Sequence, residues 1–298
     1  MTTDNYNYKY TMSNDNFTYT DGDFSVSKHF LASLIYYSPE HITGNFDCSG
    51  NRILDLYCGP KIVDGHYNCC ENHLTSLRGC ASHIKGDFWC YKNKLKNLVG
   101  GPQRVDGDYW CYHNHYLTSL EGCASHVGGI FSCSNGDLRS LIGGPKEVSG
   151  RYNCLNNNLK NLDGCASHVA ELNCRSNLIT SLVGGPQHVD GKYDCSNNYL
   201  KNLDGCASHI TELNCMDNPI TSLVGIHKII KRCNSIQFDN KRIKQGGIGL
   251  LLIENLSNIT NDSKPFKIIS NYLGTGTKGM MECSKELTAK GYAPYAKL

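Results

Sequence analysis

Cysteine and histidine recur along the chain at spacings that suggest metal binding. The sequence GCASH occurs four times, and each copy offers a Cys-x-x-His pair: Cys80/His83, Cys123/His126, Cys165/His168 and Cys206/His209. Two ligands are too few for a closed tetrahedral zinc site. The next pair is two repeats away, about 10 Å if each repeat adds one parallel strand, which is too far for one ion. We therefore predict no metal site, with the Cys buried and the Ser and His capping backbone groups.

A second stretch that matches a known sequence motif lies near the end of the chain. GTGTKG, from Gly274 to Gly279, matches the G-x-G-x-x-G fingerprint of dinucleotide-binding proteins. That fingerprint requires a strand before it, whereas the preceding KPFKIISNYL has helical spacing. We interpret GTGTKG as a turn between two helices. No Ser-His-Asp or Cys-His catalytic set stands apart from the repeated residues, so we expect no enzymatic activity and no cofactor.

The cysteines follow a period that explains their number. Nine of them are spaced 20 to 22 residues apart: Cys48, Cys69, Cys90, Cys111, Cys133, Cys154, Cys174, Cys195 and Cys215. An Asn lies three residues after all but the fifth, where Gly136 stands instead: Asn51, Asn72, Asn93, Asn114, Asn157, Asn177, Asn198 and Asn218. An aromatic residue or Leu lies two residues before each Cys. A period of this length is the signature of a solenoid.

The full pattern is x-Y-x-C-x-x-N-x-L-x-x-L, and it resembles the leucine-rich repeat over roughly Gly22 to Leu223. The connectors alternate strictly between GGP (CGP at Cys58) and GCASH, so the structural unit is a pair of turns. This alternation resembles short leucine-rich-repeat proteins encoded by tailed bacteriophages. The resemblance implies that the protein acts in the cytoplasm of a host cell, but it implies no settled biochemical activity.

The resemblance implies a leucine-rich-repeat solenoid, with a parallel β-sheet of about ten short strands, irregular connectors and a small helical C-terminal cap. Because strand residues alternate sides, the aromatic and Cys positions point inward and form a buried column. A free Cys acts there as a small apolar residue. We expect the Asn column to hydrogen-bond backbone groups where each strand bends away.

Three segments are predicted: a polar N-terminal segment (1–21), the solenoid (22–223), and a final imperfect turn with a helical module (224–298). "GDFSVSKHFLASL" fits one further N-terminal turn. Within the last segment, "GIGLLLIENLSNI" and the stretch containing Met280, Met281, Ser284 and Leu287 show helical spacing, and Gly291 fits a helix stop. Open solenoid ends need such caps.

The only two tryptophans occupy the same outward position of neighbouring repeats. Trp89 and Trp110 lie between the inward aromatic and the Cys, and Tyr91 and Tyr112 follow each Cys. Adjacent turns place each pair about 4.8 Å apart, which predicts a two-by-two aromatic patch. An outward Trp is expected to bury little surface. The predicted partner-binding residues are Asp87, Trp89, Tyr91, Asp108, Trp110, Tyr112, His66 and His113.

Two functions fit this patch. Trp and Tyr are enriched in protein-binding hot spots, which favours a protein partner, possibly a host or defence protein. A glycan or small ligand is the alternative, since Trp and Tyr beside Asp suit a sugar ring. A ladder of aromatics that only stabilises neighbouring strands remains open as well.

Composition narrows the partners further. The net charge of +2 over 298 residues gives no reason to expect nucleic acid, although a basic run lies at Lys228, Lys231, Arg232, Lys241, Arg242 and Lys244. No apolar run could span a membrane, and the N-terminus lacks a secretion signal. These features predict a cytoplasmic protein without membrane contact.

Overall fold

The computed structural model of the protein describes residues 9–13, 16–35, 38–239 and 242–298. The chain is a parallel β-solenoid of about 11 turns with a repeat of about 21 residues. It divides into two compact units. Unit 1 comprises Met1–Leu138 and Ile142–Gly150, and unit 2 comprises Arg139–Leu141 and Arg151–Leu298.

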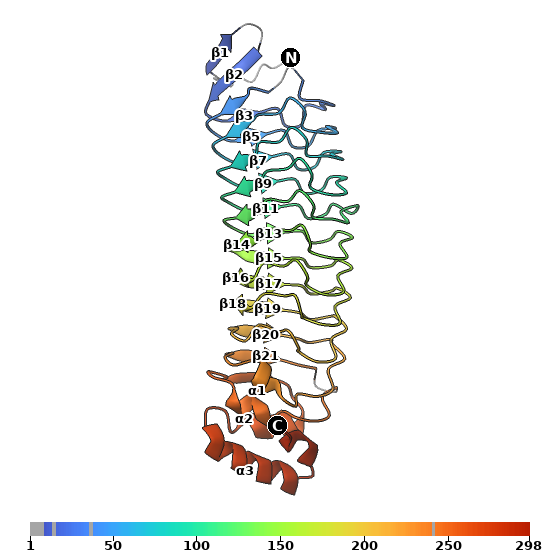
Figure 1. Cartoon of the computed structure of the whole chain (residues 1–298), viewed down its shortest axis with the longest axis vertical. Coiled ribbons are helices and arrows are strands. Elements are labelled where there is room, and N and C mark those ends of the chain that lie inside the picture. The colour runs from blue at the N-terminus through green and yellow to red at the C-terminus, as the bar shows by residue number, and fades with distance from the viewer. Residues whose placement is uncertain (1–8, 14–15, 36–37, 240–241) are drawn as a thin grey trace. The chain divides into compact units, whose positions relative to one another are not determined.

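Unit 1 contains a sheet of short parallel strands, one for each turn (Figure 1). The strands are β3 (Phe24–Ser25), β5 (Phe46–Asp47), β7 (Tyr67–Asn68), β9 (Phe88–Trp89), β11 (Tyr109–Trp110) and β13 (Phe131–Ser132). Each strand pairs in register with the next, so that Tyr67 lies beside Phe88. The predicted N-terminal turn is confirmed, because Phe24 of β3 pairs with Phe46.

The connectors of unit 1 are more regular than the sequence analysis predicted, because they form a second sheet. Its strands are β1 (Lys9–Ser13), β2 (Asn16–Asp21), β4 (His41–Ile42), β6 (Ile62–Val63), β8 (His83–Ile84), β10 (Arg104–Val105), β12 (His126–Val127) and β14 (Glu147–Val148). β1 and β2 are antiparallel, whereas β2 to β14 run parallel. In each short strand from β4 to β14 the second residue, an Ile or Val, is buried and lines the core.

The core is the predicted column of aromatic, Cys and Leu side chains. All nine column cysteines are buried, and all 17 cysteines of the chain are thiols rather than disulfides. From Phe46 to Phe131 the column aromatics pack edge to face, with ring centroids 4.9 Å apart for Phe88 and Tyr109. Aromatic pairs favour this geometry, which adds to the burial of their apolar surface.

The buried asparagines also act as predicted. The Asn93 side-chain amide donates to the carbonyl of Cys69, one turn earlier, at 3.0 Å, and to that of Cys90 at 3.1 Å. Its oxygen accepts from the Leu74 N–H at 2.9 Å. Asn72 and Asn177 repeat this arrangement. We call the column of these residues the asparagine ladder. It satisfies the backbone groups that strand pairing does not reach.

Unit 2 continues the same architecture. Its main strands are β15 (Arg151–Asn153), β17 (Glu171–Asn173), β19 (Lys192–Asp194), β20 (Glu212–Asn214), β21 (Ser235–Gln237) and β22 (Asn258–Thr260). Its second sheet holds β16 (His168–Val169) and β18 (His188–Val189). The predicted imperfect turn contains α1 (Ile226–Ile229) and β21, with Phe238 buried.

The helical C-terminal region is shorter than predicted at its start. "GIGLLLIENLSNI" is not one helix: it forms the 3₁₀ helix η1 (Ile248–Leu252) and leads into strand β22. Its apolar residues are instead buried as the side chains of another solenoid turn. The true helices are α2 (Lys264–Ser270) and α3 (Gly276–Ala289), followed by the 3₁₀ helix η2 (Ala293–Ala296).

The helical spacing predicted at Met280, Met281, Ser284 and Leu287 is confirmed by α3. Leu287 is buried together with Gly279 and Cys283, whereas Met281 is 61% exposed. The turn predicted at GTGTKG is confirmed only for Gly274 and Thr275, because α3 already begins at Gly276. The predicted helix stop is confirmed, since Gly291, with φ of 79°, follows the end of α3.

Candidate partner-binding face

Strands β9 and β11 position the aromatic residues. They run parallel, with Trp89 paired to Trp110 and Phe88 paired to Tyr109. Phe88 and Tyr109 are fully buried, so the alternation of a strand turns both tryptophans to the opposite side. The predicted adjacency of the two tryptophan positions is confirmed.

The rings pair in a way that the sequence did not specify. Tyr91 and Tyr112 stack in parallel, with ring centroids 4.6 Å apart and planes at 5°. Trp89 stacks on His66 of the preceding turn at 5.4 Å. Trp110 tilts toward Tyr112 at 5.8 Å. We call the surface formed by these five side chains the aromatic face.

The prediction that the tryptophans bury little surface is wrong. Trp89, Trp110, Tyr91 and Tyr112 are all half-buried, because each ring leans on a ring beside it. The two indole N–H groups are enclosed and have no hydrogen-bond partner among the described residues. The aromatic face is therefore held in a fixed arrangement and also exposes part of each ring.

The aspartates are engaged by the backbone. Asp87 Oδ1 accepts from the Asp108 N–H at 2.8 Å, and Asp108 Oδ1 accepts from the Ile130 N–H at 2.6 Å. His66 takes the same role one turn earlier, since its Nδ1 accepts from the Asp87 N–H at 2.9 Å. These three side chains thus connect successive turns at the start of each strand.

His113 lies beyond the end of β11, at a backbone position with φ of 53°. Its ring is 5.2 Å from that of Tyr112 and 5.8 Å from that of His115. Partial burial, together with the neighbouring His115 and Lys92, lowers the pKa of His113. At neutral pH it is therefore an uncharged ring at the rim of the aromatic face.

Two residues at this site were missed by the sequence analysis. Lys92 places its ammonium 6.0 Å from the Tyr91 ring centroid and pairs with Glu71 at 2.6 Å. Cys70, in the preceding turn, is buried against Tyr91; a hydrogen bond to Cys70, together with partial burial, raises the pKa of the Tyr91 phenol. Glu71 lies one repeat before Lys92, and Cys70 lies one repeat before Tyr91, so the repeat spacing could have indicated both contacts.

The position held by the tryptophans is polar in neighbouring strands, and there it has a structural role. The side chain accepts a hydrogen bond from the backbone N–H two residues later, at 2.8 to 3.2 Å, in Asp47, Asn68, Asn173, Asp194 and Asn214. An indole cannot accept such a bond. Trp89 and Trp110 therefore replace a turn-stabilising side chain by an aromatic one.

Three of the four histidines of the GCASH connectors contact carboxylates instead of capping the backbone as predicted. His83 contacts Asp106 at 2.8 Å, His126 contacts Glu147 at 2.8 Å, and His168 contacts Asp190 at 2.9 Å. In each case the carboxylate belongs to the next turn, a position that a single repeat does not reveal. No group of three or more His, Cys, Asp or Glu side chains has metal-binding geometry in the described part of the chain.

Two members of the basic run make contacts within the protein. Lys231 donates to the His227 carbonyl, and Arg242 pairs with Asp239 at 3.3 Å. Lys241 lies outside the described residues. Of the helices that the structure describes, none has the length and apolar character needed to cross a membrane.

Comparisons with models of protein families, with curated proteins and with solved structures each gave no significant match, so the sequence and the geometry carry the functional argument.

Proposed function

We propose that this chain is a non-enzymatic binding module of the leucine-rich-repeat type that recognises another protein through its aromatic face. The observation that carries the proposal is that Trp89 and Trp110 stand where neighbouring strands hold a polar side chain that stabilises the turn. Each gives up a turn hydrogen bond, which is worth about 0.5–1.5 kcal/mol. The exchange supplies large aromatic surface at two adjacent positions, and such residues dominate the energetics of protein interfaces.

The stacking of the rings supports this role. The Tyr91–Tyr112 stack and the Trp89–His66 stack hold the side chains in place before a partner arrives. Prior ordering reduces the conformational entropy that is lost on association. A rigid, partly exposed aromatic surface therefore suits a partner that covers it with a complementary apolar patch.

The carboxylates favour a protein over a glycan at this face. Sugar recognition combines an aromatic ring with polar groups that orient the hydroxyls. Asp87 and Asp108 each use one oxygen to accept from the backbone of the next turn. Fewer polar groups remain to orient a sugar, so glycan binding here is the weaker candidate.

The repeat pattern supports a finer proposal about family and setting. The inward aromatic, Cys and Leu positions, together with the alternating GGP and GCASH connectors, match the resemblance to short leucine-rich-repeat proteins of tailed bacteriophages. In that setting the chain acts in the host cytoplasm, and its partner is a host or defence protein.

The test replaces both tryptophans by the residue that the neighbouring strands carry. Trp89→Asn with Trp110→Asn restores the turn hydrogen bond while it removes the indoles. We expect the double variant to fold and to lose partner binding by at least about 2 kcal/mol per Trp, or roughly 30-fold in affinity for each. The partner is first isolated from host lysate with the wild-type chain, and affinities are then measured with the purified partner.

The matched control is Asn173→Ala, at the equivalent position of β17. It removes one turn hydrogen bond and leaves the aromatic face intact, so it should melt at a slightly lower temperature and bind normally. Normal binding by the tryptophan variant would contradict the proposal. In that case, a lower melting temperature would assign the aromatic residues a structural role alone.

A further inference from the structure

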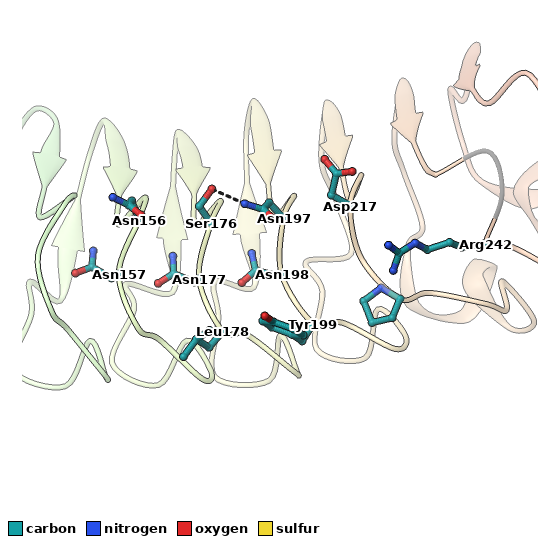
Figure 2. Close-up of a pocket in the computed structure, with 11 residues that line it drawn as sticks. Asn156, Asn157, Ser176, Asn177, Leu178, Asn197, Asn198, Tyr199, Asp217 and Arg242 are labelled. Atoms are coloured by element: carbon teal, nitrogen blue, oxygen red, sulfur yellow. Dashed lines mark hydrogen bonds between the residues drawn. The ribbon is translucent and has the colours of Figure 1, made fainter.

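A second candidate surface lies in unit 2 and shares no residue with the aromatic face. It is an open groove of about 750 Å³ that crosses several turns. Figure 2 shows three rows of side chains along it, each row contributed by successive turns. The upper row contains Asn156, Ser176, Asn197 and Asp217, the middle row Asn157, Asn177 and Asn198, and the lower row Leu178 and Tyr199.

The middle row is the asparagine ladder, whose side chains are occupied by the backbone. The Asn198 amide donates to the carbonyls of Cys174 and Cys195, and its oxygen accepts from the Ile179 N–H. The middle row therefore forms a fixed floor. The two outer rows supply the groups that a ligand would meet.

The groove is open because the outer rows carry short or flat side chains. Residues of the upper row adopt a left-handed backbone conformation, with φ of 58° at Ser176 and 54° at Asn197. In unit 1 the equivalent positions hold Glu71 and Lys92, with φ of 54° and 52°. Their long side chains form an ion pair at 2.6 Å across adjacent turns. The same backbone thus carries a charged surface in unit 1 and a hollow one in unit 2.

The two walls differ in chemistry. The upper row presents amide, hydroxyl and carboxylate groups, which donate and accept hydrogen bonds. Asn197 and Ser176 are already joined at 2.9 Å, which fixes their orientation (Figure 2). The lower row presents Tyr199, 57% exposed, beside Leu178. At one end Arg242 is paired with Asp239, which compensates its charge.

We infer that this groove binds a short, uncharged oligosaccharide that runs across the turns. A sugar has hydroxyl groups around its edge and an apolar C–H face. The hydroxyls match the upper row, with Asp217 accepting the charge-assisted bond. The C–H face matches the Tyr199 ring. The inference is independent of the protein-binding role proposed for the aromatic face.

A peptide fits the groove less well. Extended peptides commonly bind by adding a strand to a free sheet edge. Here β17, β19 and β20 are paired side by side, so the groove contains no such edge. An anion is disfavoured because Asp217 contributes a negative charge and Arg242 is already paired.

The decisive variant is Asn197→Lys, which copies the residue found at the equivalent position in unit 1. Lys92 shows that this backbone tolerates Lys, so the variant should fold while it fills the groove. Isothermal titration would use cellohexaose, maltohexaose and chitohexaose as probes, with a Gly-Ser hexapeptide for comparison. We expect at least one saccharide to bind, and both Asn197→Lys and Tyr199→Ala to weaken its binding about tenfold or more.

Two controls separate this site from the aromatic face. Lys94→Ala changes the lower-row position in unit 1 and should leave saccharide binding unchanged. The Trp89→Asn/Trp110→Asn variant should also bind the saccharide normally. The inference fails if none of the three saccharides binds at millimolar concentration, if the peptide alone binds, or if Asn197→Lys binds as well as the wild type. Loss of binding only in the tryptophan variant would move the saccharide site to the aromatic face.

Discussion

At the scale of single residues, polar side chains at the strand ends connect each turn to the next. Each residue of the asparagine ladder bonds to two successive turns, as Asn93 does with Cys69 and Cys90. Asp87 and Asp108 connect turns in the same way through one carboxylate oxygen. An outward-facing polar residue in this solenoid is therefore often a structural link to the next turn.

The cysteines allow a direct test of the core at this scale. Burial raises the pKa of the Cys90 and Cys111 thiols, and the thiolate is the form that alkylating agents attack. We expect iodoacetamide to label exposed Cys58 rapidly in the native protein and the column cysteines only after unfolding. Mass spectrometry of the labelled peptides measures this. Rapid native labelling of Cys90 or Cys111 would show that the column is open to solvent.

A buried hydroxyl offers a second test. Tyr109 is fully buried, and its hydroxyl has no hydrogen-bond partner among the described residues. A buried unsatisfied polar group costs about 1–3 kcal/mol. Tyr109→Phe copies the residue found in the turns on either side, Phe88 and Phe131, and should leave the melting temperature unchanged or raise it. A fall of several degrees would mean that the hydroxyl makes a stabilising bond, and Phe88→Tyr serves as the reverse control.

At the scale of elements, the turn pair explains why the connectors alternate. Tyr67 and Tyr109 follow connectors of the GGP type, and their hydroxyls lie near the Gly that precedes the Pro in each. A Cβ at Gly59 would lie 3.0 Å from the Tyr67 hydroxyl, and one at Gly101 would lie 3.4 Å from the Tyr109 hydroxyl. The turns after GCASH carry Phe or Leu in the column instead. The second Gly thus makes room for the longer phenol.

The connector sheet should respond to acid. Asp64 accepts from Lys85 and from His41, and these bonds lower the pKa of its carboxyl group. A carboxyl whose folded pKa is lowered stabilises the fold above its unfolded pKa, about 3.9. That stabilisation is lost as the pH falls through the folded value. The stability difference between the wild type and Asp64→Asn should therefore shrink between about pH 4 and pH 2.

Urea unfolding at several pH values measures that difference. Asp204→Asn, at an exposed position outside the connector sheet, is the matched control and should give no comparable change with pH. A difference between the wild type and Asp64→Asn that stays constant down to pH 2 would contradict the assigned ion pairs.

At the scale of the whole molecule, each turn is held mainly by its neighbours, as in other repeat proteins. The strands of unit 2 pair in sequence order, β15 with β17, β17 with β19, and β19 with β20. Stability should then depend on whole turns and their register. The division of the chain at residues 21 and 223 stays a prediction.

Deleting whole turns tests this property. Removal of residues 154–194 joins Asn153 to Cys195 and preserves the pattern of inward and outward residues. The shortened chain should fold with a β-rich circular dichroism spectrum and a cooperative melt. Removal of residues 154–163 leaves a turn of about half length that lacks the buried Cys154, Asn157 and Leu159, and should unfold the surrounding turns. Equal folding of the two deletions would refute the register argument.

The sequence by itself determined which side chains of this protein point into the core. The period of about 21 residues, the buried column of aromatic residues and cysteines, and the role of the Asn after each Cys could all be predicted. The reason is local: alternation along a strand decides which side chains point inward, and each repeat confirms the pattern independently. The place of Trp89 beside Trp110 followed from the same register.

Only the tertiary structure decided what the outward side chains do. In the tertiary structure Trp89 stacks on His66 rather than on Trp110. Asp87 and Asp108 accept hydrogen bonds from the backbone, and the apolar stretch at Ile248 forms a solenoid turn. Unit 2 has a groove at Asn197, whereas Lys92, at the equivalent position of unit 1, forms an ion pair with Glu71. Each of these outcomes depends on residues a full turn apart, whose side-chain directions are set by contacts between turns and not by the local pattern.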